Sequence, residues 1–206
     1  PNPGPGMNWF EMDVLGFNEQ FFSVLSLLSS ILTLLGIIIL RPYIAKNSIA
    51  NVIMVLSIAG SVLFLPSIGM YYGLHNWTAS ISAGIIDAKF IAIINTALES
   101  PLGQVAMIPL LAWIAKNAPS NMKATFFAVF ASFTNLALSA SALLTKYLNE
   151  IFIITREVKD KVTNQIVSTP DYTELGILLI TVTLLMLILP IGAIFIVQQS
   201  RFKTTD

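Results

Sequence analysis

An ionisable side chain and a helix-breaking proline interrupt the stretch NTALESPLGQ, residues 95–104, within an otherwise apolar run. Asn95, Glu99 and Gly103 are spaced four residues apart, so a helix places them on one face, with Gln104 at its flank. A charged side chain near the middle of a membrane costs roughly 2.5 to 3.5 kcal/mol, and such groups usually face an interior cavity on an ion or solute pathway. The alternative is a protonated Glu99 that hydrogen-bonds to a neighbouring helix. We favour the first interpretation, in which Glu99 faces a cavity on an ion or solute pathway.

Pro101 follows Glu99 by two residues and cannot donate a backbone hydrogen bond to the carbonyl group of Ala97. Its ring also clashes with that carbonyl group, so we expect the helix to kink at Pro101. The freed carbonyl group can then bond water, a side chain or a ligand. Transporters build binding sites at such interruptions, although prolines are also common in ordinary membrane helices.

Further polar side chains lie in the apolar stretch that follows. Ser132, Asn135 and Ser139 fall on one face of a helix, and Asn135 is costly against lipid, so it should face another helix or water. This face therefore either contacts a neighbouring helix or contacts a ligand. Asp87 and Lys89 precede the run that holds Glu99, at its expected outer mouth. They form either a solvated interface or an entrance at which Lys89 attracts an anionic solute.

Two kinds of apolar segment can be distinguished by their small polar residues. Ser23, Ser26, Ser30 and Thr33 recur at helical spacing in the first segment, where they either allow close helix packing or line a cavity. The second and fifth segments are almost wholly apolar, which suits the lipid-facing periphery.

The composition is that of a membrane protein. Of the 206 residues, 55% are hydrophobic and 11% are charged, whereas soluble domains have about 25% charged residues. The net charge of +0 and the lack of a basic tract give no sign of nucleic-acid binding. The chain has no cysteine and one histidine, His75, so we expect no disulfide, no metal site, no cofactor and no enzymatic activity.

Five stretches meet the length that a membrane-crossing helix needs, about 20 mostly apolar residues. We therefore predict an all-α transmembrane fold, with residues 1–17 as the end of a truncated helix and residues 150–174 as an extracytoplasmic loop. The predicted spans are residues 21–40, 49–69, 90–115, 124–148 and 175–197.

The charges of the connectors predict an orientation. The connectors 41–48 and 116–123 and the tail after Val197 carry basic residues, whereas the connector 70–84 carries neither lysine nor arginine. The positive-inside rule places the basic connectors and residue 206 in the cytoplasm. The loop 150–174 argues against this orientation, because it holds Arg156, Lys159 and Lys161 on the expected outer side. We expect a multi-pass protein of the plasma (inner) membrane.

Long blocks of the sequence resemble the folate–biopterin transporter family of the major facilitator superfamily. They are DVLGF at 13–17, ESPLGQVAMIPLLAWIA at 99–115, KATFFAVFASFTNLALSAS at 123–141, TKYLN at 145–149 and DYTELG at 171–176. The resemblance implies twelve helices in two six-helix halves that move solute by alternating access. On that map residues 1–206 are the C-terminal transmembrane half, with its first helix truncated, and the N-terminal half is the missing partner.

The resemblance also implies the solute and the residues that handle it. Its substrates are folates and pteridines, taken up with protons, and the matching site positions are Glu99, Gln104 and Asn135. Family members tend to have an aspartate where this chain has Asn95, so the coupling or the substrate is expected to differ here. Two other functions remain open, an accessory membrane subunit without a solute site and a carrier of a different organic anion.

Overall fold

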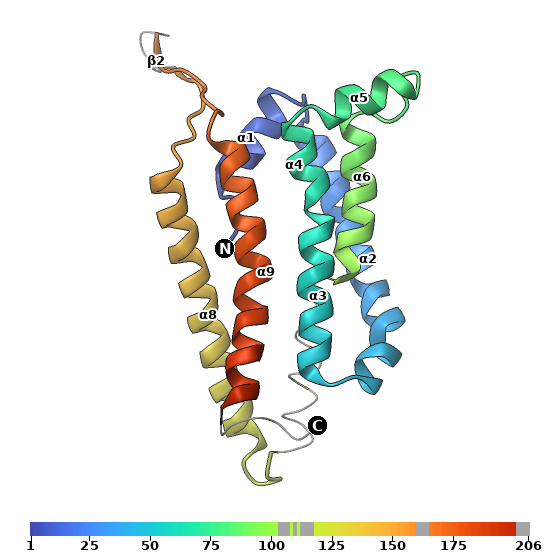
Figure 1. The fold of residues 1–206 in the computed structure, drawn as a ribbon, viewed down its shortest axis with the longest axis vertical. Helices are drawn as coiled ribbons and strands as arrows, with labels where there is room; N and C mark the ends of the chain where they lie inside the picture. Colours follow the sequence, from blue (N-terminus) through green and yellow to red (C-terminus); the bar gives the residue numbers. More distant parts are fainter. Residues whose placement is uncertain (103–107, 109–110, 112–117, 160–164, 201–206) are drawn as a thin grey trace.

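The structure of the chain, a computed structural model, describes residues 1–102, 108, 111, 118–159 and 165–200. Its long helices run side by side along the long axis of the molecule (Figure 1). One end carries α1 (Pro5–Asp13), α5 (Leu74–Ile81) and a small hairpin, and we call it the hairpin end. The opposite end carries the connector that follows Lys46 and the start of the helix at Lys123, and we call it the basic end.

Four helical segments are long and apolar enough to cross a membrane among the residues that the structure describes. They are Glu19–Lys46, Ile49–Tyr71, Lys123–Ile151 and Leu175–Gln199. Each includes or overlaps one of the predicted spans. The remaining predicted span, residues 90–115, is described in part. Its first portion is α6 (Ala88–Glu99) followed by the short 3-10 helix η1 (Ser100–Leu102), and most of the rest lies outside the described residues.

The first long helix, α2 (Glu19–Lys46), is longer than the predicted span 21–40. The Asn18 side chain caps it by accepting the Phe21 N–H at 2.8 Å, and the helix continues through Pro42. Twenty-eight residues reach about 42 Å at 1.5 Å per residue, more than the roughly 30 Å hydrocarbon core. Most of the basic connector predicted at residues 41–48 is therefore helical, and its charges lie beyond the apolar part of the same helix.

The second predicted span is two helices, α3 (Ile49–Leu63) and α4 (Leu65–Tyr71), which meet at Phe64. Pro66 stands in the first turn of α4, where a missing N–H costs least. The connector predicted at residues 70–84 holds the helix α5. The last two long helices, α8 (Lys123–Ile151) and α9 (Leu175–Gln199), meet at the hairpin end, where Leu148 of α8 and Leu175 of α9 belong to one hydrophobic cluster.

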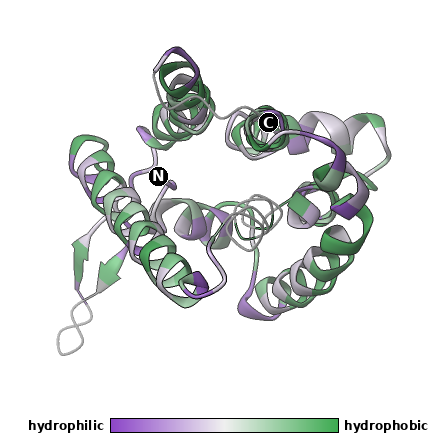
Figure 2. Cartoon of the chain, turned by 90° about the horizontal axis from the view of Figure 1, so that it is seen from below, coloured by the Kyte–Doolittle hydropathy of each residue, from purple (hydrophilic) through white to green (hydrophobic). Residues whose placement is uncertain are grey.

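The main hydrophobic core lies toward the hairpin end, where α9 begins. Leu175, Leu178, Leu179 and Val182 are fully buried there, in a cluster that also includes Met7 and Phe10 of α1 and Leu148 of α8. The opposite half of α9 is exposed, as it is at Ile188 and Ile196. Because α9 is apolar all round, one face packs against protein and the other is suited to lipid. The hydrophobic colour covers most of the long helices in Figure 2.

The predicted loop 150–174 contains structure that the sequence analysis did not anticipate. Strands β1 (Val158–Lys159) and β2 (Ile166–Ser168) pair antiparallel, and Thr155 and Asp171 form an isolated bridge. The all-α description therefore needs this correction outside the spans. The pattern is hard to recognise in sequence because the strands are so short.

Side chains tie this loop to the end of α1. Arg156 Nη2 donates to Asp13 Oδ1 at 2.9 Å, and the Tyr172 hydroxyl donates to Asp13 Oδ2 at 2.6 Å. The Tyr172 hydrogen bond, followed by the Arg156 contact, lowers the pKa of Asp13. Burial, followed by the bond to Asp13, raises the pKa of Tyr172 to about 12, so the hydroxyl stays a donor at neutral pH.

Gly36 of α2 allows the closest approach between α2 and η1. A Cβ atom added at Gly36 would overlap the Cα atom and the carbonyl oxygen of Pro101, both of them backbone atoms that cannot rotate away. This contact fixes the position of the turn that follows Glu99.

Replacing Gly36 by alanine is therefore expected to lower stability by about 1–3 kcal/mol, the usual cost of overpacking. The control is Gly192→Ala in α9, where an added Cβ meets nothing within 4 Å. The measurement is the free energy of unfolding of the purified protein in mixed micelles. Equal stability of the two variants would show that α2 and η1 do not approach this closely.

The Asp13 contacts predict a dependence of stability on pH. Because the folded pKa of Asp13 is lowered, its stabilising contribution is complete above the ordinary pKa of aspartate and is lost as the pH falls through the lowered value. Asp13→Asn should therefore lower the melting temperature at neutral pH, and the difference from wild type should shrink on acidification.

The matched control is Glu150→Gln, which removes an exposed ion pair with Lys146 on the surface of α8. Exposed pairs of this kind contribute about 0 to 1 kcal/mol, so a small difference is expected at every pH. A difference for Asp13→Asn that persisted unchanged at acidic pH would contradict the assignment.

Candidate functional site

Glu99 is the last residue of α6, at the point where the α-helix gives way to η1. Pro101 stands in η1, and its lack of an N–H accounts for the end of regular α-helical bonding there. The backbone N–H of Ser100 still bonds to the Thr96 carbonyl group. A kink at Pro101 would be seen as a change in helix direction after Leu102. Residues 103–107 lie outside the described residues, so the kink stays a prediction.

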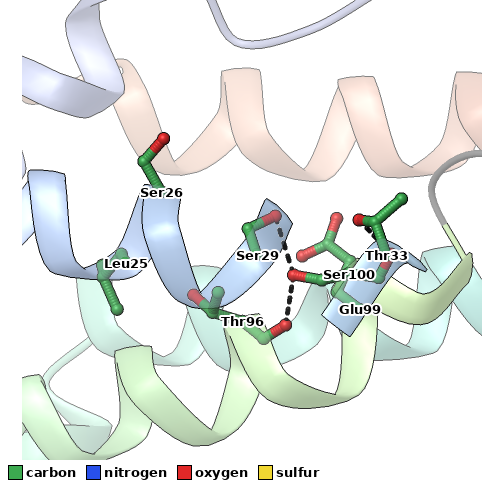
Figure 3. A pocket seen from close by; sticks show the side chains of 7 residues that line it. All are labelled: Leu25, Ser26, Ser29, Thr33, Thr96, Glu99 and Ser100. Atoms are coloured by element: carbon green, nitrogen blue, oxygen red, sulfur yellow. Dashed lines mark hydrogen bonds between the residues drawn. The ribbon is translucent and has the colours of Figure 1, made fainter. Parts of the chain in front are cut away.

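A cavity of about 480 Å³ opens between α2 and α6 next to Glu99 (Figure 3). Its lining is rich in hydroxyl groups and has one charged side chain among the described residues. The lining residues are Leu25, Ser26, Ser29, Thr33, Thr96, Glu99 and Ser100.

The hydroxyl groups of this cavity join α2 to η1. Thr33 Oγ1 donates to the Ser100 carbonyl oxygen at 2.9 Å, and Ser100 Oγ is hydrogen-bonded to Ser29 Oγ at 2.9 Å. Ser100 Oγ also bonds to the Thr96 carbonyl oxygen within α6 (Figure 3). The bonds satisfy a carbonyl group at the helix interruption, where the regular pattern fails.

Glu99 also borders a second cavity, of about 470 Å³, between α3 and α9. Its lining is mostly aliphatic, with Leu56 and Gly60 from α3 and Leu185 and Leu189 from α9. The Glu99 carboxyl group therefore stands between a hydroxyl-rich space and an apolar one. Cavities of about 300–1,000 Å³ with mostly apolar walls and a few polar groups are typical of small-molecule sites.

Asn95 lies one turn before Glu99, as its spacing predicts. Asn95 Nδ2 donates to Glu99 Oε2 at 3.4 Å, while Asn95 Oδ1 is buried without a hydrogen-bond partner in the described part of the chain. Asn95 is not among the residues that line either cavity next to Glu99. Asn95 therefore contacts the Glu99 carboxyl group but does not line the cavities that Glu99 borders.

The structure does not bring the predicted residues of α8 to Glu99. Ser132, Asn135 and Ser139 are exposed in this chain, and none of them lines the two cavities beside Glu99. Ser132 Oγ and Ser139 Oγ donate to the carbonyl groups of their own helix, each at 2.9 Å. Gln104 lies outside the described residues. The roles of these four residues stay predictions.

The predicted entrance residues have local structural contacts. Asp87 caps α6, because its Oδ1 accepts the Phe90 N–H at 2.8 Å. Lys89 Nζ lies 5.9 Å from the centre of the Phe21 ring, within the range of a cation–π contact. Both residues stand at the hairpin end of α6, and their entrance role stays a prediction.

Sequence reasoning missed Ser29, Thr96 and Ser100. The signal was present, because Ser26, Ser29 and Thr33 follow the spacing of one helical face, and Gly36 continues it. The stripe expected at residues 23, 26, 30 and 33 overlaps this face, because Ser26 and Thr33 line the cavity. Ser23 Oγ and Ser30 Oγ instead donate to carbonyl groups of α2 itself.

The contact between Ser29 and Ser100 can be tested with a double-mutant cycle. Ser29→Ala and Ser100→Ala should show a coupling energy of about 0.6 kcal/mol, the average for a hydrogen bond between membrane helices. The measurement is the free energy of unfolding in mixed micelles. Ser23→Ala is the control partner, because its hydroxyl bonds to Glu19 of its own helix, and its effect should add to that of Ser100→Ala.

A comparison with protein families gives the class of this protein. No curated protein and no solved structure matches the chain. The family model described as the BT1 family matches residues 5–205. This is a family of membrane transporters similar to the major facilitator superfamily, not a family of enzymes, and membership implies transport of folates or pteridines. The chain, a multi-pass membrane protein, belongs to the BT1 family, the folate–biopterin transporters.

Proposed function

We propose that this chain is the C-terminal half of a secondary active transporter that moves folates or pteridines by alternating access, with protons as the coupling ion. The supporting observation is that Glu99 borders both cavities and is the one charged side chain on their described linings. Alternating access requires a second half that faces these cavities and rocks against them.

Glu99 is the residue to which we assign the proton. Its carboxyl group is half-buried at the end of α6, and intramembrane acids of this kind serve as proton carriers in transporters. Folates carry carboxylate groups, so an ionised Glu99 would repel them, whereas a neutral Glu99 would not. Protonation of Glu99 thus removes the negative charge from the site and allows an anionic solute to bind.

The same carboxyl group can also accept hydrogen bonds from the amino-pyrimidine edge of a pterin. The hydroxyl groups of Ser26 and Thr33 offer further partners on one side, and the aliphatic wall near Leu185 offers an apolar surface to the ring on the other. A flat heterocycle with one polar edge suits a site that lies between a hydroxyl-rich cavity and an aliphatic one. Asn95, Gln104, Asn135 and Ser139 are proposed to contribute hydrogen bonds from the rest of the site.

The rival function of an accessory subunit predicts a Glu99 face that is dry and fully paired. The two cavities beside Glu99 favour the transporter. Competition experiments separate the proposed solutes from other organic anions. Unlabelled pterins should reduce uptake of labelled folate, and unrelated organic anions should not.

The proton-coupling role predicts a change in the pH profile of uptake. Wild-type uptake of labelled folate should rise as the outer pH falls, whereas Glu99→Gln, which holds the site neutral, should flatten the profile. The assay uses the transporter expressed from its complete gene. Glu150→Gln, an exposed acid on α8, should retain the wild-type profile. Equal profiles for wild type and Glu99→Gln would refute coupling through Glu99.

A further inference from the structure

The side-chain oxygen of Asn95 is buried and receives no hydrogen bond from the described part of the chain. A buried acceptor without a donor loses its hydration and gains nothing in return, so it destabilises the fold. The other end of the same amide, Nδ2, donates to Glu99 Oε2 at 3.4 Å. One end of the Asn95 amide is therefore bonded to the acid, and the opposite end has no donor among the described residues.

The direction of this amide matches one protonation state of Glu99. An ionised carboxylate only accepts hydrogen bonds, so it requires a donor such as Nδ2. A protonated carboxyl group has an O–H to donate, and it then requires an acceptor such as Oδ1. A half-turn of the amide exchanges its oxygen and nitrogen atoms without moving the rest of the side chain.

We propose that the Asn95 amide reverses when Glu99 gains or loses a proton, and that Asn95 is the positioning residue that supports both states of the acid. In the ionised state, Nδ2 donates to the carboxylate. In the protonated state, the Glu99 O–H donates to Oδ1, which gains the donor that it lacks here. No covalent bond of the amide forms or breaks, and the only proton exchanged is that of Glu99. The inference rests on the proposed role of Glu99 as the proton carrier.

The surroundings leave few other groups to sense this proton. The described residues that α2, α3 and α9 contribute to the two cavities are neutral. The charged or titratable groups on elements packed against α6 stand toward the ends of α2, at the end of α4, on α5 and at the start of α6. They are Glu19, Arg41, Tyr43, Lys46, Tyr71, His75, Asp87 and Lys89.

Infrared difference spectroscopy between alkaline and acidic pH tests the inference on the purified transporter expressed from its complete gene. Incorporation of asparagine labelled with ¹³C at the side-chain carbonyl separates the side-chain amide from the backbone. On acidification a protonated carboxyl band should appear, and a labelled amide band should shift with the same midpoint. Glu99→Gln should abolish both changes, and Asn95→Leu should abolish the amide change.

The matched control is Asn51→Leu, which removes an exposed asparagine at the start of α3 and should leave both changes intact. A second readout is the midpoint of folate uptake against pH. A reversing amide bonds to both states of Glu99, so Asn95→Leu should leave the midpoint in place, whereas loss of a fixed Nδ2 donor would raise it by about half a pH unit. Asn51→Leu should leave this midpoint in place.

The outcomes separate this inference from the proposed function. A Glu99-dependent carboxyl band with a silent Asn95 amide would overturn the amide reversal and leave proton coupling through Glu99 intact. The lack of any Glu99-dependent carboxyl band across the pH range of uptake would overturn both. Simultaneous carboxyl and amide changes, both lost in Glu99→Gln, would support both.

Discussion

The structure around residues 95–102 depends on the cost of placing a carboxyl group inside an apolar protein that spans a membrane. Glu99 cannot face lipid without a large penalty, so it must face a space that water or a solute can occupy. Two cavities meet at this residue, one rich in hydroxyl groups and one aliphatic. Residues of α2, α3, α6 and α9 line the two cavities.

The geometry that meets this requirement comes from residues without charge. Pro101 ends the α-helical bonding just after Glu99, and the lack of a side chain at Gly36 lets α2 approach the turn closely. Thr33 and Ser29 then satisfy polar atoms of Ser100 across the same contact. The interruption is therefore stabilised from the neighbouring helix, and the carboxyl group is held at a defined place.

The spans and their polar residues follow largely from the sequence, because apolar length and helical spacing are local properties. The long helices lie where hydropathy predicts them, and Asn95 contacts Glu99 as a spacing of four residues requires. The contact between Ser100 and Ser29 could not be predicted in this way, because it depends on how two helices pack. The pairing of Asp13 with Arg156 is similarly distant, because the two residues are 143 positions apart in sequence, and the short strands beside it leave no periodic signal.

That pairing gives the two sides of the hairpin end different mechanical properties. On one side, α3 and α4 are joined through the backbone at Phe64, so their separation would require stretching the chain. On the other side, α1 is attached to the hairpin and to the start of α9 by the side chains of Asp13, Arg156 and Tyr172. Such an attachment can release and re-form while every helix stays intact. The α1 side is thus held to the hairpin and to α9 by side chains, through the hydrogen bonds of Asp13 and the packing of Met7 and Phe10 in the main core.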